Sequence, residues 1–386
     1  MSQSQERFCV NAEKARAEIS KFTPKGGGVT EYHVMVHATD PTATYTEQLD
    51  AVLSAYYGLL QTRLTGATSV IKRYFLSDAA NQYAQLLASV PEAPACACSV
   101  VEQAPLDGTK VALWACLLTG TDGGTFADGL YKVSHGAYTH LWGGTATAAA
   151  GTSAEQTSLL LNDYVMRLFA NGGSLEKNCV RTWFFVQNVD VNYAGVVKAR
   201  NEVFYTQNLT SKTHFIASTG INGRNADPSV LVQMDTYSVL GTKPGQVKYL
   251  YAPTHLNPTY EYGVSFERGT RVDYGDRRQV YISGTASIDN KGQVVYPGDI
   301  RRQTMRMWEN VEALLSEAGC GFGDVGQMIV YLRDPSDYAV VSAMFAERFP
   351  DTPKVIVLAP VCRPGWLIEM ECMATGAEGC ADFAAF

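Results

Sequence analysis

The segment VRTWFFVQNVDVNY, residues 180–193, decides the fold because two other parts of the chain repeat it. VIKRYFLSDAANQY (residues 70–83) and VGQMIVYLRDPSDY (residues 325–338) share its first Val, its β-rich centre, its polar turn and its closing Tyr at the same spacing. Each segment is typical of a strand, a turn and the start of a helix. The repeat predicts three copies of one structural unit.

Further elements recur around these segments. An amphipathic helical stretch that opens near a Gln precedes each one, at residues 48–60, 156–169 and 303–315. Each copy ends in one more strand, which contains VALWACLL, VLVQMDTYSV or WLIEMECMA. Gly-rich joints at residues 119–129 and 241–246 divide the copies. The expectation is an α+β fold with a helical lead and three copies, at residues 1–28, 29–125, 126–245 and 246–386.

The last of these strands lies in APVCRPGWLIEMECMA, residues 359–374, where two carboxylates stand among apolar residues. With a period of two, Glu369 and Glu371 project from one face of the strand. Burial and like-charge proximity both favour the protonated form, so one of them is a candidate general acid. Arg363 is the matching clamp for an anionic substrate. An Arg–Glu ion pair that closes a sheet edge would use the same residue types.

Two more residues are candidates for binding an anion. Arg224 occupies roughly the place in the second copy that Arg363 holds in the third, so the cleft between these copies would bring both near one ligand. A surface arginine after a Gly-containing turn is the alternative. Tyr262 could donate a hydrogen bond to a carboxylate or hydroxyl, although aromatic residues in strands also form the core.

Composition narrows the classes of partner. Charged residues make up 18% of the 386 residues and the net charge is -7, without a long basic run, which argues against nucleic acid and favours a small molecule. The charged N-terminal segment is unlike a secretory signal, and no apolar run approaches the ~18 residues that span a bilayer. Nine cysteines without a CxxC pair indicate a reduced, cytoplasmic protein. Motifs for a metal or an organic cofactor are missing, so neither is expected.

A family resemblance joins these observations. YISGTASID, DVGQMIVYLRDPSDY and the ending Arg363…IEMEC make residues 264–374 similar to the Rid superfamily, also called the YjgF family. Members are usually trimers of one such domain, with ligand sites in the clefts between subunits. The resemblance therefore implies three tandem Rid-like (chorismate mutase-like) domains that form an intramolecular pseudo-trimer, and a monomeric chain.

Longer motifs resemble the chorismatase family: HLNPTYEYGVSFERGT, VDYGDRRQVYISGTASIDNKG, IASTGINGR, FLSDAANQ and APVCRPGWLIE. Those enzymes remove the enolpyruvyl side chain of chorismate, a dianion, as pyruvate. The resemblance implies a cofactor-independent enzyme in which Glu369 matches the family's acid.

The resemblance also suggests a product. Capture of the activated ether by water gives a dihydroxycyclohexadiene carboxylate, whereas attack by the ring hydroxyl gives 3-hydroxybenzoate. The chain resembles the second branch at Gly275 and Cys362, which implies space for the ring and a catalytic role for the thiol. A turn that requires positive φ is the alternative for Gly275, and simple packing is the alternative for Cys362. Competing functions are imine or enamine deamination, as in many single-domain Rid proteins, and non-catalytic ligand binding.

Overall fold

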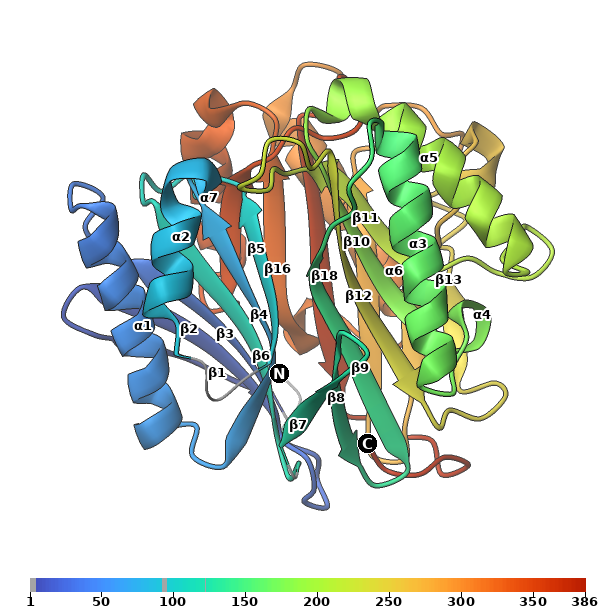
Figure 1. Cartoon of the computed structure of the whole chain (residues 1–386), viewed down its shortest axis with the longest axis horizontal. Coiled ribbons are helices and arrows are strands. Elements are labelled where there is room, and N and C mark those ends of the chain that lie inside the picture. Colours follow the sequence, from blue (N-terminus) through green and yellow to red (C-terminus); the bar gives the residue numbers. More distant parts are fainter. Residues whose placement is uncertain (1–4, 92–95, 122) are drawn as a thin grey trace.

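Three six-stranded sheets follow one another along the chain in the computed structural model, which describes residues 5–91, 96–121 and 123–386 (Figure 1). The strand orders are β1-β2-β3-β6-β4-β5, β7-β8-β9-β12-β10-β11 and β13-β14-β15-β18-β16-β17. Each sheet thus contains a three-stranded meander, the last long strand of its copy and a pair of strands that run parallel. The shared topology confirms the predicted α+β fold of three tandem units.

The first two copies have the following elements. The first contains β1 Gln5–Asn11, β2 Ala15–Phe22, β3 Glu31–Ala38, α1 Tyr45–Thr62, β4 Ala67–Leu76, α2 Ala79–Ser89, β5 Ala97–Glu102 and β6 Val111–Thr119. The second contains β7 Gly124–Ala127, β8 Leu130–His135, β9 Tyr138–Ala146, α3 Ser153–Ala170, α4 Leu175–Asn178, β10 Cys179–Val186, α5 Val189–Thr206, β11 Ala217–Asn222 and β12 Val232–Leu240.

The third copy carries the candidate catalytic strand. It contains β13 Val247–Leu250, η1 Thr259–Tyr262, β14 Gly269–Asp273, β15 Arg278–Ala286, α6 Ile300–Glu317, η2 Phe322–Asp324, β16 Val325–Leu332, η3 Pro335–Asp337, α7 Tyr338–Arg348, β17 Lys354–Leu358 and β18 Ile368–Gly376. The three repeated segments form β4 and the start of α2, β10 and the start of α5, and β16 with η3 and the start of α7.

The predicted helical lead at residues 1–28 is wrong. Residues 5–22 form the antiparallel hairpin of β1 and β2, which opens the first sheet, and residues 1–4 lie outside the described part of the chain. Ala15, Ala17 and Ile19 are buried on β2 and alternate with more polar positions, which is the period of a strand. The first copy therefore begins at this hairpin.

The repeated Gln at the start of each long helix has a structural task. Gln48, Gln156 and Gln303 are buried, and their side-chain oxygens accept from the backbone N–H of Lys110, of Leu231 and Val232, and of Leu367. Each of these backbone donors lies at or just before the start of the last strand of its copy. The Gln therefore ties the helix to the segment that leads into β6, β12 or β18. In the third copy this contact fixes the loop before Glu369.

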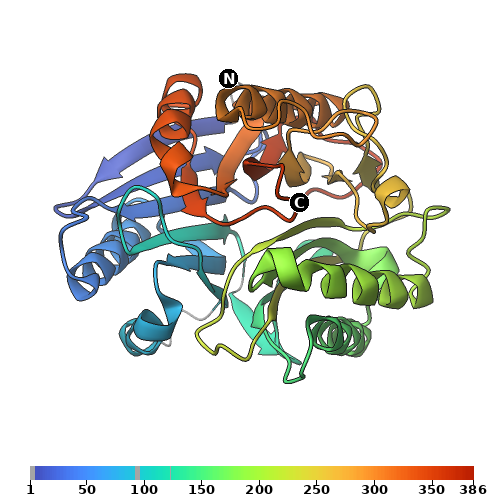
Figure 2. The same ribbon diagram turned by 90° about the horizontal axis from the view of Figure 1, so that it is seen from above.

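The three copies surround a common centre, with the sheets inside and the helices outside (Figure 2). The largest core cluster contains residues of all three copies, among them Trp114, Trp183 and Met370. No helix of the described residues has both the length and the apolar character that a membrane crossing requires.

Charged groups are paired at this centre. Arg73 of the first copy donates to Asp235 of the second over 2.9 Å, and Arg181 of the second donates to Glu371 of the third over 2.8 Å. All four side chains are at most 2% exposed. Breaking a buried pair of this kind typically costs about 3–5 kcal/mol, so the network locks the copies together.

We expect the protein to be a monomer near 42 kDa in solution, because the three copies cover one another's inner faces. Multi-angle light scattering on the full chain measures this directly. A stable particle of three chains would contradict it.

Candidate active site

A cavity of about 460 Å³ lies between the second and third copies. Tyr193 on α5 is its contribution from the second copy. The third copy supplies the remaining lining residues from the segment before β14, from β15 and the residue two positions beyond it, and from the loop and strand at β18: Tyr262, Val264, Phe266, Arg268, Gly284, Ala286, Ile288, Cys362, Arg363, Trp366 and Glu369.

Glu369 is the acid of this cavity. It is the second residue of β18, where it pairs with Ala286 of β15 and Tyr331 of β16, and it is 5% exposed. Its carboxyl group has no hydrogen-bond partner among the described residues. Gly284 makes room for it, because a Cβ at that position would overlap with Oε1 of Glu369.

Glu371, two residues further on, has the opposite surroundings. Its oxygens accept from Arg181 Nη2 at 2.8 Å, from Trp183 Nε1 at 2.7 Å and from Thr219 Oγ1 at 2.5 Å. The sequence predicted one face for both carboxylates, and β18 does present both on that side. One of them is held by the central network and the other is left facing the cavity.

The protonation of Glu369 follows from this contrast. Burial and the neighbouring charge of Glu371 raise the pKa of Glu369 to about 8, although Arg181 and Arg268 act in the opposite direction. A carboxyl group with this pKa is protonated at neutral pH and can act as a general acid.

Two arginines line the cavity without a carboxylate partner among the described residues. The guanidinium of Arg363 lies 4.5 Å from the ring centroid of Tyr262 and 4.9 Å from that of Trp366. Arg268 is 4% exposed, donates to the backbone and side-chain oxygens of Asn257 and lies 5.5 Å from Tyr262. Two buried or half-buried positive charges beside a neutral acid make a site for an anion.

Cys362 and Tyr193 close one side of the cavity. Burial, together with the nearby Glu369, raises the pKa of the Cys362 thiol to about 12, and burial likewise raises the pKa of Tyr193. Both groups are therefore neutral near pH 7. The thiol is a weakly polar wall and not a thiolate nucleophile.

Four of the six predicted site residues meet in this cavity: Glu369, Cys362, Arg363 and Tyr262. Arg224 does not. It pairs with Glu102 of the first copy at 2.9 Å and lies in the junction between the first and second copies. The prediction failed because corresponding positions of two copies lie at different junctions: the loop after β11 meets the first copy at Glu102, whereas the loop after β17 meets the second copy at Ile221.

Gly275 also lies outside the cavity. It packs against the end of the chain, where its N–H donates to Ala384 O and a Cβ would come within 2.7 Å of Phe383 O. It is not among the glycines with positive φ, so the predicted turn conformation is wrong as well. Close backbone packing is the reason for a glycine here.

Sequence reasoning missed Arg268, Gly284 and Tyr193. Signals for all three were present: Arg268 ends the motif EYGVSFER that contains Tyr262, Gly284 is the glycine of YISGTAS, and Tyr193 closes the second repeat. Nothing in the spacing distinguishes these positions from turn and core residues. Their common cavity arises only when the second and third copies pack together.

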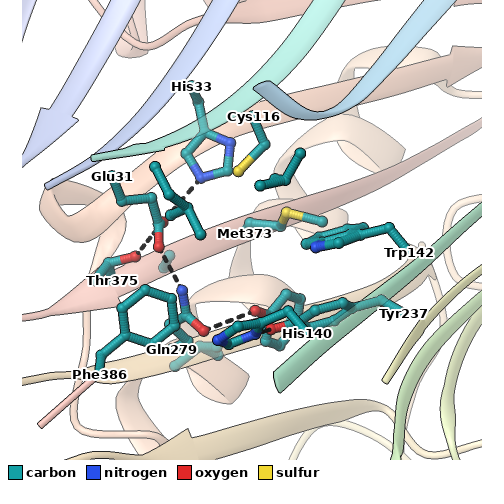
Figure 3. Close-up of a pocket in the computed structure, with 15 residues that line it drawn as sticks. Glu31, His33, Cys116, His140, Trp142, Tyr237, Gln279, Met373, Thr375 and Phe386 are labelled. Atoms are coloured by element: carbon teal, nitrogen blue, oxygen red, sulfur yellow. Dashed lines mark hydrogen bonds and ion pairs between the residues drawn. The ribbon is translucent and has the colours of Figure 1, made fainter. Parts of the chain in front are cut away.

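A second cavity, of about 340 Å³, lies on the central axis and combines residues of all three copies (Figure 3). Its carboxylate, Glu31, accepts from Gln279 and from Thr375 and contacts His33 Nε2. Burial alone would raise the pKa of Glu31, but His33, the charge of Arg277 and Thr375 together lower it to about 2. This ionised, saturated carboxylate has no proton to give, so the axial cavity does not compete as the acid site.

No group of three or more His, Cys, Asp or Glu side chains that could hold a metal gathers within residues 5–91, 96–121 and 123–386.

Comparisons with known proteins define the class. Residues 271–376 match the family model for Endoribonuclease L-PSP. A RutC family protein of Pyrococcus abyssi is 36% identical over 97 residues, which are 25% of this chain and 76% of that protein. The 3-aminoacrylate deaminase RutC of Acinetobacter baylyi is 34% identical over 97 residues, or 25% of this chain and 77% of that enzyme. The chain belongs to this family through its third copy, which confirms the Rid resemblance.

A larger likeness concerns the fold of the whole chain. A crystal structure of a chorismatase superposes with a TM-score of 0.64 at 18% identity, and the match covers 80% of this chain and 93% of that one. The three-copy architecture is therefore shared with a chorismatase.

We expect the carboxyl group of Glu369 to titrate near pH 8. Infrared spectra of the wild type at pH 7 should contain the C=O band of a protonated carboxylic acid that Glu369→Gln removes, and the band should disappear as the pH rises through about 8. Because this pKa lies above the unfolded value of 4.5, Glu369 favours the folded state below pH 4.5 and progressively less toward pH 8.

Glu267→Gln is the matched control, since Glu267 is another buried glutamate with a raised pKa that does not line this cavity. A Glu369 band that is already missing at pH 6 would show that Glu369 is ionised and would remove it as the acid.

Proposed function

We propose that the protein removes the enolpyruvyl group of chorismate as pyruvate, without a cofactor, and that Glu369 is the general acid. The observation that carries the proposal is a buried carboxyl group, with its pKa raised to about 8, in a cavity with two arginines that have no carboxylate partner among the described residues. Chorismate is a dianion with an acid-sensitive enol ether, so it matches both features. The likeness in fold to a chorismatase supports the proposal.

The chemistry requires one proton and one nucleophile. Glu369 protonates the terminal methylene carbon of the enol ether, and the ether oxygen stabilises the resulting oxocarbenium ion. Arg363 and Arg268 bind the two carboxylates and so hold that carbon near Glu369. Attack by water then gives pyruvate and the dihydroxycyclohexadiene carboxylate, whereas displacement by the ring hydroxyl gives pyruvate and, through an arene oxide, 3-hydroxybenzoate.

Deamination of an enamine is the second candidate, because the RutC deaminase is a relative of the third copy and that chemistry also uses an arginine and an acid. A small monocarboxylate would leave Arg268 without a partner. Two separate incubations of the purified protein distinguish these functions, one with chorismate and one with 2-aminoacrylate that is generated in the reaction mixture. Pyruvate with an aromatic or dihydrodiol product supports the proposal, and ammonia without turnover of chorismate supports the deaminase.

Glu369→Gln should abolish pyruvate release while the fold is retained, since the amide keeps the shape of the side chain but cannot give a proton to carbon. Loss of general acid catalysis typically lowers the rate ~10²- to 10⁴-fold. For the wild type, kcat should fall as the pH rises through about 8, where Glu369 ionises. A coupled lactate dehydrogenase assay measures pyruvate, and a near-normal rate in the variant would exclude Glu369.

We propose 3-hydroxybenzoate as the main product, now on the basis of Cys362 and Gly284. Cys362 lines the cavity as a neutral thiol, and Gly284 takes the role proposed for Gly275, because it is a glycine inside the cavity. Gly284 leaves space beside Glu369, and the side chain of Cys362 leaves little space for water next to the ring.

Cys362→Ala should shift the products toward the dihydrodiol, because the smaller side chain admits water beside the activated ether. A change of ~1.4 kcal/mol between the two barriers is tenfold in product ratio. Cys372→Ala is the matched control, since Cys372 is also buried and near Glu369 in sequence but does not line the cavity. Liquid chromatography of the products measures the ratio, and wild-type protein that yields mainly the dihydrodiol would refute this product assignment alone.

A further inference from the structure

A row of alternating arginine and aromatic side chains begins in the wall of the candidate active site and continues into the core of the second copy. In order, it contains Trp366, Arg363, Tyr262, Arg268, Phe266, Arg200 and Phe184, and we call it the arginine–aromatic ladder. Each guanidinium lies between 4.5 and 5.9 Å from the ring centroids on its two sides. The ladder thus gathers three positive charges from α5, from the segment before β14 and from the loop before β18.

Arg200 is the buried end of this ladder. Its side chain is 1% exposed, and its Nε and Nη2 have no hydrogen-bond partner in the part of the chain that the structure describes. A buried guanidinium without an acceptor is strongly unfavourable. The proposed mechanism does not use this residue, so its retention needs another explanation.

The position of Arg200 relates it to the cavity. Tyr193 and Arg200 are seven residues apart on α5 and therefore lie on the same side of the helix, and Tyr193 lines the cavity. Arg200 is not among the residues that line the cavity, whereas Phe266 is. The ring centroid of Phe266 lies 5.8 Å from the guanidinium of Arg200 and 5.5 Å from that of Arg268, so one phenyl ring contacts both groups.

The backbone of Phe266 is fixed, but its side chain is only partly buried. Its N–H donates to Thr259 Oγ1 at 3.4 Å and its O accepts from the same hydroxyl at 2.5 Å, so the ring can move aside only by rotation of the side chain. Asn201, the neighbour of Arg200, donates to Gly263 O at 3.0 Å and accepts from Ser265 Oγ at 2.6 Å, which joins α5 to the segment before β14. Cation–π contacts are weaker than charge-assisted hydrogen bonds to a carboxylate, so an anion would replace the ring favourably.

We propose that Arg200 is a specificity residue for dianions: Phe266 turns aside when the ligand enters, and one carboxylate is then bound between Arg200 and Arg268 while Arg363 binds the other. This inference rests on the proposed function for the identity of the substrate, but it concerns the class of ligand and can be tested without turnover. Arg363 and Arg268 already favour a ligand with two carboxylates, and Arg200 would strengthen the binding of the second one. The third arginine makes a second negative group on the ligand necessary for full affinity.

The test compares two unreactive ligands, isophthalate with two carboxylates and benzoate with one, by isothermal titration calorimetry on the full chain. Arg200→Met should lower the affinity for isophthalate about 10- to 100-fold, the effect of losing a charge-assisted hydrogen bond, and should change that for benzoate little. Thermal unfolding without ligand should occur at the same or a higher temperature, because an unpaired buried charge has been removed.

Lys198→Met is the matched control, because it removes the same charge from an exposed position on the same helix. It should leave both affinities unchanged. Should Arg200→Met fail to fold, Arg200→Lys keeps the charge without the bidentate fork and should still weaken isophthalate selectively. Phe266→Leu should bind isophthalate at least as tightly as the wild type.

Equal losses for benzoate and isophthalate in the Arg200 variants, or an unchanged affinity for isophthalate, would overturn the proposal. Weaker isophthalate binding by Phe266→Leu would overturn the movement of the ring. Neither result depends on pyruvate release. Conversely, a protein that binds isophthalate through Arg200 but releases no pyruvate would refute the proposed function and leave the preference for dianions standing.

Discussion

The buried charge network at the centre of the molecule is the constraint on which the rest depends. Arg73, Asp235, Arg181 and Glu371 come from three copies and meet where no water can solvate them, so each cation needs its carboxylate. Trp114, Asp235 and Glu371 are each the fourth residue of the last strand of their copies. A homotrimer has one residue type at three such positions, whereas a single chain can place one indole and two carboxylates there against two arginines. Fusion of the copies permits this balanced asymmetry.

The same asymmetry explains why one cleft carries the proposed chemistry. Ala112, Gln233 and Glu369 are each the second residue of those strands. Ala112 has no titratable group, and Gln233 is bonded to Val100 O and to Asn225. Arg224 of the second copy is paired with Glu102. Only in the third copy does a carboxyl group at this position face a cavity lined by arginines without carboxylate partners among the described residues.

Local sequence patterns predicted the order of the secondary-structure elements and most of the site residues. They failed where the path of the chain determines the position of a residue. The order of strands and helices followed from three repeats, and the acid, one arginine, the thiol and Tyr262 followed from one strand and its loop. The β1–β2 hairpin was mistaken for a helix because its charged residues alternate with apolar ones over too short a span to distinguish the periods clearly. Arg224 and Gly275 were misplaced because resemblance along the sequence does not determine which junction a loop enters. No sequence pattern indicated Arg200. The residue stands out because its buried guanidinium lacks an acceptor among the described residues, and only tertiary packing produces that situation.

The two glutamates of β18 show how packing assigns different roles to equal side chains. They are two residues apart on one face, and the sequence therefore left open which of them is the acid. Glu371 points to the axis, where Arg181, Trp183 and Thr219 bind it. Burial raises the pKa of Glu369, and the charge of Glu371 raises it further. Glu369 points to the cavity, where Gly284 leaves space and no hydrogen-bond donor among the described residues contacts it. Packing of the copies thus acts on Glu369 twice: it buries the carboxyl group, and it places the charge of Glu371, which joins two copies, beside it, so the assembly of the fold and the pKa of the candidate acid are coupled.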